Sequence, residues 1–380
     1  MKTSSGLRNI LGAFSDGAVL FPLLALLTLK AGFSGGIILL STGIAYVVAA
    51  LLFRVPMAVQ PLKSIAVAAI TVGASFSEVR LSGMLLGAFC LFMCLFDVDR
   101  IAKKVSEAMI HGLQAGLGVL LVLQGLKAGG DFTLMVSSLG GILALLGAVF
   151  MLIWPEVAGI PVLGLVATIG LGIAVFFPGA SVGANLVSTD NEVVRPMLVL
   201  GLLLPQIVLT SANSVLATRN VCERYFGEQA RYVTIRRLLY SIGFGNLLTG
   251  MIGGMPFCHG SGGVTAHVRG GSTKAWSTAF MGFFLLVLSW VQFHNPSSSI
   301  VYPPLLVATL LIATGVFHLK LAAPTAQTNF GKAKIAVALA LTLLTRNLLW
   351  VLGAAVLLEI IGAGLSSMGL QRKKQMEVGA

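Results

Sequence analysis

The stretches that decide the fold of this chain are VPMAVQPLKS at residues 55–64 and GMPFCHGSGG at residues 254–263. Each places prolines, glycines or polar side chains inside a segment that is otherwise apolar enough to cross a lipid bilayer. Because lipid offers backbone groups no hydrogen-bond partners, such interruptions are tolerated only where protein covers them or where they line a wet cavity. Two interrupted segments at corresponding places of two halves indicate the substrate site of a secondary transporter.

The composition is that of a membrane protein. The 380 residues are 57% hydrophobic and only 10% charged, and the mean hydropathy is +0.96, whereas soluble domains carry about 25% charged residues. We therefore expect an all-α polytopic membrane protein whose main partner is the lipid bilayer. The net charge of +12 does not indicate a nucleic-acid partner, because the basic residues lie in short loops between apolar segments and report membrane topology.

The apolar segments predict about 14 spans, since a span needs roughly 20 apolar residues. They lie at about 10–29, 35–53, 57–76, 81–96, 106–126, 133–154, 160–178, 196–218, 236–254, 257–268, 275–293, 299–317, 333–345 and 347–366. The third and tenth are the broken ones. We expect the last two to form a hairpin that turns at Arg346, because one continuous helix would expose this arginine to lipid.

The loop charges predict the orientation. With the N-terminus inside the cell, most of the 25 Lys and Arg residues fall on the cytoplasmic side, which predicts an inner-membrane protein with both termini cytoplasmic. Seven spans per half is an odd number, so the second half must be inverted relative to the first. We expect a first repeat at 1–180, a second at 196–366, and a short cytoplasmic tail at 367–380.

The first broken segment predicts an anion site. Pro56 and Pro61 indicate that a helix begins near Lys63, and the free N–H groups of a helix N-terminus attract anions. The charge of Lys63 would strengthen that field, and Gln60 and Ser64 would add hydrogen-bond donors. The alternative is a lysine that extends to the membrane interface.

The second broken segment also predicts an anion site, but with different functional groups. Gly260, Gly262 and Gly263 let backbone amides approach a ligand closely, and Ser261 can donate a hydrogen bond. His259 donates when neutral or becomes charged near neutral pH, with a tightly packed structural histidine as the alternative. No second Cys-His pair at ligand spacing and no Gly-Lys-Ser/Thr ending exists in either segment, so neither a metal nor another cofactor is expected.

Further polar residues lie inside predicted spans. Asp16, in the first span, needs a partner, a proton or water: it could pair with Lys63, exchange a coupling proton, or lie near the interface. Gln206, Thr210 and Asn213 lie in the eighth span and join the predicted substrate site. Polar side chains in membrane helices often only join helix to helix, which is the alternative for each of these three.

Together these residues resemble a known family. Residues 56–66 (PMAVQPLKSIA) are similar to the PMPVQPMK signature of the molybdate transporter branch of the sulfate permease (SulP-like) superfamily, and residues 255–263 (MPFCHGSGG) to its PMCHGAGG signature. The resemblance implies a 7+7 inverted repeat with uracil-permease-like core and gate domains. The core would comprise spans 1–4 and 8–11, and the gate spans 5–7 and 12–14. The anion would bind between the third and tenth spans and move with the core, as in an elevator. Ala58, Phe257 and Ser261 depart from the signatures.

The leading hypothesis is a secondary active transporter of a small tetrahedral oxyanion, molybdate or sulfate. Coupling to a proton, as in a symporter, would use Asp16 or His259. A nucleobase permease of the same fold is disfavoured, since Asn213 and His259 stand where the resemblance implies carboxylates. An anion channel is a further alternative, whereas no group of residues indicates an enzyme. The choice of oxyanion, the coupling ion and a homodimeric state stay open.

Overall fold

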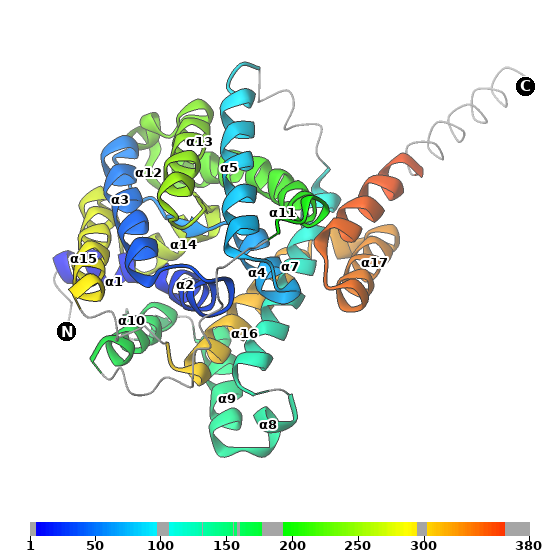
Figure 1. Cartoon of the computed structure of the whole chain (residues 1–380), viewed down its shortest axis with the longest axis horizontal. Coiled ribbons are helices and arrows are strands. Elements are labelled where there is room, and N and C mark those ends of the chain that lie inside the picture. Colours follow the sequence, from blue (N-terminus) through cyan, green and yellow to red (C-terminus); the bar gives the residue numbers. More distant parts are fainter. Residues whose placement is uncertain are drawn as a thin grey trace, which may run out of the picture.

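The structure, a computed structural model, describes residues 5–96, 106–130, 132–154, 156–157, 160–176, 193–294 and 302–361, most of them in helices (Figure 1). Among these residues, six helices are long and apolar enough to cross a membrane, or seven if the bent pair at the N-terminal end counts as one span. The predicted helical membrane fold is therefore confirmed. Several other helices are shorter than a full span, so the count of 14 stays a prediction.

The elements of the first half lie in this order: α1 (Ser5–Phe14), α2 (Gly17–Ala31), α3 (Gly35–Phe53), β1 (Gln60–Pro61), α4 (Lys63–Val72), α5 (Phe76–Met93), α7 (Glu107–Ala128), α8 (Phe132–Ser137), α9 (Leu139–Ile153), β2 (Glu156–Val157), β3 (Ile160–Pro161) and α10 (Val162–Phe176). The second half contains α11 (Pro196–Leu209), the π-helix η2 (Thr210–Ala217), α12 (Thr218–Phe226), the 3-10 helix η3 (Gly227–Tyr232), α13 (Ile235–Ile252), β4 (Phe257–Cys258), α14 (Ser261–Arg269), α15 (Ala275–His294), α16 (Pro304–Leu321), the 3-10 helix η4 (Thr325–Gln327), α17 (Asn329–Thr345) and a last helix, Leu348–Ile361.

Each predicted segment contains helix within the residues that the structure describes, and two local details refine the expectation. The first predicted span is two helices, α1 and α2, that meet at an angle of 40° on either side of Ser15 and Asp16. The hairpin near the C-terminal end is present, because Arg346 ends α17 in a left-handed conformation with φ of 54° before the last helix begins. The chain thus turns at Arg346.

Two pairs of long helices cross through glycines. A Cβ atom at Gly43 in α3 would lie 2.8 Å from the carbonyl oxygen of Gly282 in α15, and one at Gly87 in α5 would lie 2.8 Å from that of Gly243 in α13. Small residues let membrane helices approach closely, so that van der Waals packing holds them together. Each crossing joins a helix of the first half to one of the second, and the two crossings fit an inverted repeat.

Two short strands meet at the centre of the bundle, which the sequence did not reveal. β1 and β4 pair antiparallel, with Gln60 opposite Cys258 and Pro61 opposite Phe257. Asn246 of α13 completes β4 from its other side: its Nδ2 donates to the Phe257 carbonyl at 2.7 Å, and its Oδ1 accepts from the Phe257 N–H at 2.9 Å. These bonds satisfy the irregular backbone within the membrane protein's interior.

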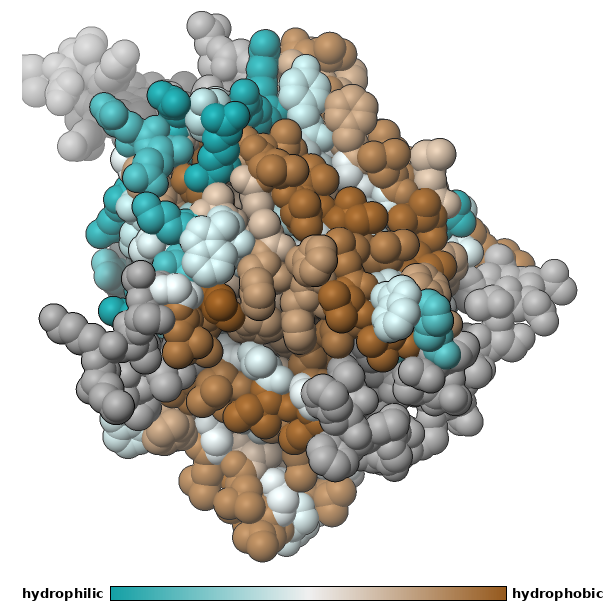
Figure 2. All heavy atoms as spheres, turned by 90° about the vertical axis from the view of Figure 1, so that its left-hand side faces the viewer, coloured by the Kyte–Doolittle hydropathy of each residue, from teal (hydrophilic) through white to brown (hydrophobic). Residues whose placement is uncertain are grey.

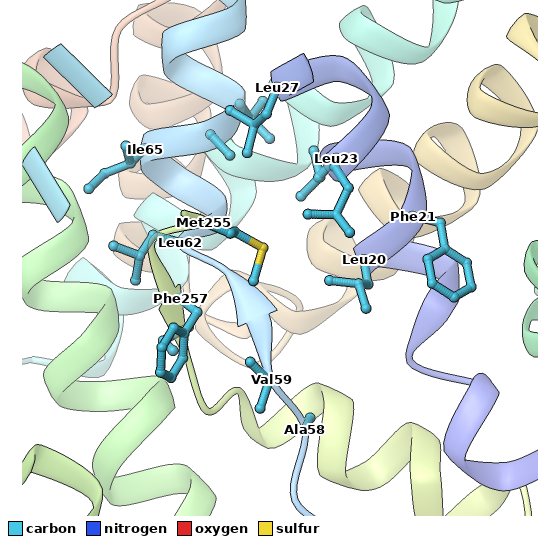
Figure 3. Close-up of a cluster of buried hydrophobic side chains, with 14 of the residues drawn as sticks. Leu20, Phe21, Leu23, Leu27, Ala58, Val59, Leu62, Ile65, Met255 and Phe257 are labelled. Carbon is cyan, nitrogen blue, oxygen red and sulfur yellow. The ribbon is translucent and has the colours of Figure 1, made fainter. Parts of the chain in front are cut away.

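Apolar packing fixes the two broken segments against α2. Figure 3 shows Leu20, Leu23 and Leu27 of α2 on one side of the two broken segments, whose residues Val59, Leu62, Ile65, Met255 and Phe257 belong to the same apolar cluster. All of these side chains are buried. Because close-packed side chains transmit displacement rather than absorb it, α2, β1, α4 and β4 should move as one unit.

A buried carboxylate joins three helix ends. Glu78, fully buried, accepts hydrogen bonds from Arg195 Nε and Nη2, both at 2.8 Å, and from the Ser75 N–H at 2.9 Å. Arg195 also donates to the carbonyl of Gly73 at 3.0 Å. The Ser75 hydroxyl accepts from the Glu78 N–H, which completes a capping box at the start of α5. These bonds tie the end of α4 to the starts of α5 and α11, and the bonds with Glu78 raise the pKa of Arg195.

Candidate functional site

The antiparallel contact of β1 and β4 brings the N-termini of α4 and α14 together beside a cavity. Residues from both broken segments line it, together with residues from three further helical regions: Gln60, Lys63, Ser64, Gln114, Leu117, Gln206, Leu209, Asn213, Ser214, Cys258, Gly260 and His318. Of the eleven residues predicted to bind substrate, six lie in this lining: Gln60, Lys63, Ser64, Gly260, Gln206 and Asn213.

Lys63 supplies the positive charge of the cavity. It is the first residue of α4, and only 9% of it is exposed. Within the described part of the chain, its ammonium forms no ion pair with a carboxylate. A buried charge is costly unless something compensates it, and the cavity beside Lys63 is the place where an anion could do so.

Gln206 holds the start of α4 in place. Its Oε1 accepts from the Ser64 N–H at 3.0 Å, and its Nε2 donates to the Thr210 hydroxyl at 2.9 Å. The Ser64 hydroxyl itself is buried without a hydrogen-bond partner among the described residues. Gln206 thus occupies one of the free amides of the helix N-terminus, and the Ser64 hydroxyl remains available to a ligand.

The eighth predicted span unwinds locally where it passes the cavity. Residues Thr210–Ala217 form a π-helix, a rare form that often occurs at functional sites. The Thr218 hydroxyl is shared between two carbonyl oxygens, that of Asn213 at 3.0 Å and that of His259 at 2.7 Å. The Asn213 side chain accepts from the Ser261 hydroxyl at 2.6 Å. The π-helix therefore connects the eighth span directly to the start of α14.

His259 faces away from the cavity. Its Nδ1 lies 2.9 Å from the Ala58 carbonyl oxygen, its Nε2 lies 2.8 Å from the Ser241 hydroxyl, and the side chain is completely buried. Both ring nitrogens therefore already have protein partners. In this conformation His259 ties the first broken segment to α13, which corresponds to the structural alternative considered for it.

Gly263 packs against a second polar centre, built around Asp16. The Asp16 carboxylate accepts from the Tyr46 hydroxyl at 2.6 Å and from the Gln60 side-chain amide, and its Oδ2 lies 3.8 Å from His267 Nε2. Asp16 does not pair with Lys63, which was one of the alternatives, since the described structure contains no ion pair between them. Because Gln60 touches both Asp16 and the cavity, the two polar centres are adjacent.

Two further polar side chains reach the cavity from α7 and α16, and sequence reasoning missed both. These helices run antiparallel: a Cβ atom at Gly118 would lie 2.7 Å from the Gly315 carbonyl oxygen, and one at Gly125 would lie 3.0 Å from that of Ala308. Gln114 precedes Gly118 by one turn and His318 follows Gly315 by one turn, so both lie at the same level. A glutamine inside an apolar segment was a signal for the first, whereas nothing in the local sequence distinguished the second.

The polar groups around the cavity are not all satisfied by the protein. Gln60 Oε1, Ser64 Oγ, Gln114 Oε1 and His318 Nδ1 are buried and have no hydrogen-bond partner among the described residues. Buried polar atoms are normally paired, so such a group of orphans points to a missing ligand or water. No three His, Cys, Asp or Glu side chains in the described ranges lie close enough together to hold a metal ion.

The same fold occurs in solved anion transporters. The transmembrane domain of a cyanobacterial bicarbonate transporter, BicA, is similar with a TM-score of 0.62 at 19% identity, over 94% of this chain and 98% of that one. The murine Slc26a9 anion transporter in its inward-facing state is similar with a TM-score of 0.65 at 12% identity, over 95% of this chain and 68% of that one. The fold is therefore that of membrane anion transporters.

Sequence comparison narrows the class. Residues 8–121 and 198–319, more than half of the chain, match the family described as "Molybdate transporter of MFS superfamily", and the chain belongs to this family. Two relatives from Arabidopsis thaliana are each 24% identical: Molybdate transporter 2, over 80% of this chain and 76% of the relative, and Molybdate transporter 1, over 76% and 73%. The protein is a multi-pass membrane transporter and not an enzyme, and the predicted family is confirmed.

Proposed function

We propose that this protein transports molybdate as a dianion, which binds in the cavity at the N-termini of α4 and α14. The observation that carries the proposal is the buried ammonium of Lys63. Among the residues that the structure describes, it has no carboxylate partner, and it lies beside a cavity where several polar atoms are likewise unpaired. Charge-assisted hydrogen bonds of the kind that an oxyanion would form with Lys63 are the strong ones. The names of the relatives favour molybdate over other oxyanions of the same shape.

We assign the anion's contacts on both sides of the cavity. Lys63, the Ser64 hydroxyl and the Gly260 region would hold it from the broken segments, while Gln114 and His318 would face it from α7 and α16. His259 and Gln206 would position these groups without touching the anion. The alternative of a nucleobase permease fits less well, because none of the described residues that line the cavity is a carboxylate that could recognise ring N–H groups.

The elevator mechanism is part of the proposal. α2, β1, α4 and β4 would move together because their buried side chains belong to one apolar cluster (Figure 3). The α7–α16 pair would remain fixed, since it is held by its own glycine crossing. Sliding of one group past the other would carry the anion and would break its contacts with Gln114 and His318.

A coupling proton would bind at Asp16. The Gln60 side-chain amide donates a hydrogen bond to the Asp16 carboxylate. Protonation of that carboxylate would weaken the hydrogen bond and so change the position of Gln60 at the cavity. His267 Nε2 lies 3.8 Å from the Asp16 carboxylate, and neither of the His267 ring nitrogens has a hydrogen-bond partner among the described residues. His267 therefore replaces His259 as the second candidate for proton exchange. In this scheme, Asp16→Asn would abolish proton-driven accumulation but leave molybdate binding intact.

Uptake into proteoliposomes tests the function. Purified protein should accumulate labelled molybdate saturably, faster with an inward proton gradient, and an excess of uracil should not compete. Sulfate and tungstate as competitors would measure selectivity among tetrahedral oxyanions. Absence of molybdate uptake, or an ohmic current in place of saturable flux, would contradict the proposal.

A further inference from the structure

A cluster of arginines surrounds one tyrosine, away from the transport cavity. The guanidinium carbon of Arg54 lies 4.4 Å from the centre of the Tyr232 ring, and those of Arg231 and Arg237 each lie 5.0 Å from it. Arg54 and Arg231 both donate to the Tyr232 hydroxyl, at 3.1 and 3.2 Å. The tyrosine thus gathers three positive charges that belong to the end of α3, to η3 and to the start of α13.

The three positive charges are not balanced by carboxylates in the part of the chain that the structure describes. In the ranges that the structure describes, none of the three arginines forms an ion pair with a carboxylate. The π electrons of the Tyr232 ring attract each guanidinium group, but a cation–π contact at an exposed site is weak. Three guanidinium groups around one ring repel one another, so an anion placed among them would be strongly attracted.

The backbone of Arg54 gives independent support. Arg54 ends α3 with φ of 57° and is one of only two non-glycine residues with positive φ in the described structure. Glycine is the usual residue at such a helix end, because a side chain makes the left-handed conformation costly. An arginine at this position suggests that its side chain is needed there, since observed strain often marks a functional position.

The surface beside the cluster is apolar and exposed. Leu51 and Leu52, just before Arg54, are 70% and 42% exposed, and Tyr240 and Phe244 of α13 are also exposed. Arg237 donates to the Leu52 carbonyl at 3.5 Å, so the cluster and this apolar surface are continuous. Figure 2 shows hydrophilic residues gathered at one end of the molecule, above a broad hydrophobic face.

We propose that Arg54, Arg231, Arg237 and Tyr232 form a binding site for the phosphate of an anionic phospholipid headgroup. Guanidinium groups suit phosphate because their planar forks can donate two parallel hydrogen bonds. Acyl chains of the same lipid would lie along Leu51, Leu52 and Phe244. A lipid held there would join the end of α3 to η3 and α13. This site is separate from the cavity at Lys63 and does not depend on the proposed substrate.

Native mass spectrometry of the full-length protein tests the site. The protein in detergent would be titrated with phosphatidylglycerol or phosphatidylcholine, and separately with inorganic phosphate. The wild type should retain phosphatidylglycerol in preference to phosphatidylcholine. The triple variant Arg54→Gln, Arg231→Gln, Arg237→Gln should bind phosphatidylglycerol at least about tenfold more weakly. Arg224→Gln, which removes an exposed arginine of α12 outside the cluster, is the matched control and should bind as the wild type does.

Two further measurements keep the outcome decisive. Arg54→Gly removes one charge and relieves the backbone strain, so it should fold at least as well as the wild type and still lose part of the lipid preference. Unchanged phosphatidylglycerol binding in the triple variant would overturn the proposal, and so would equal loss in Arg224→Gln. Displacement of the lipid by millimolar inorganic phosphate would identify a soluble anion as the occupant and overturn the lipid assignment.

Discussion

Replacing Lys63 with methionine tests the central assignment, because methionine keeps most of the side chain's length and removes only the charge. Lys63 is 9% exposed and lies at the start of α4 beside the cavity. Without ligand, the variant should be as stable as the wild type or more stable, since a buried charge without a carboxylate partner is costly. With molybdate, the order should reverse.

The size of the effect follows from the contact that is lost. A charge-assisted hydrogen bond contributes about 1.5–3 kcal/mol, and two unit charges 4 Å apart attract by about 4 kcal/mol at an effective dielectric constant near 20. A loss of about 2–4 kcal/mol weakens binding roughly 30- to 1000-fold. At a molybdate concentration 1000 times the wild-type Kd, the wild type gains about 4 kcal/mol of stability, whereas the variant gains only about 0.4–2 kcal/mol.

Thermal unfolding of the purified protein with increasing molybdate measures both quantities. Lys30→Met is the matched control, because it removes an exposed lysine from the last turn of α2 and should leave the molybdate response unchanged. If Lys63→Met is stabilised by molybdate as strongly as the wild type, Lys63 does not bind the anion. If the variant is unstable without ligand, the reasoning about an uncompensated charge is wrong.

Four other substitutions probe the cavity and the packing around it. Gly263→Ala would place a Cβ atom 2.7 Å from Gln60 Nε2, so it should lower stability by about 1–3 kcal/mol and impair molybdate uptake, as measured by thermal unfolding and proteoliposome flux. Gln114→Ala and His318→Ala should each weaken molybdate binding by about fivefold to tenfold, the loss of one hydrogen bond. Each should also lower stability without ligand, because the truncation leaves a cavity at a buried position. An unchanged Kd would remove them from the site. Glu78→Gln should lower stability by about 1–3 kcal/mol, which is less than for a fully buried ion pair because solvent screens the 54% exposed arginine partner. The molybdate Kd should stay the same.

The composition of the sequence predicted a helical membrane protein, while the core-and-gate fold was implied only by the resemblance of two short signatures. Long apolar segments, interrupted at residues 55–64 and 254–263, place the chain in a membrane and mark the two places where a backbone can line a cavity. The turn at Arg346 was equally predictable, since an arginine in the middle of a span is costly in lipid. These inferences require only the polarity of each segment and the inability of lipid to solvate polar groups.

The tertiary structure decided which side chains share a site. Lys63 and His259 are both candidates in the sequence, yet His259 contacts Ala58 and Ser241 while Lys63 lines the cavity. Gln114 and His318 come from helices far away in the chain and enter the lining only because α7 and α16 cross. The direction of a side chain and the crossing of two helices depend on long-range packing, which no local pattern records, and for this reason the structure alone could assemble the site.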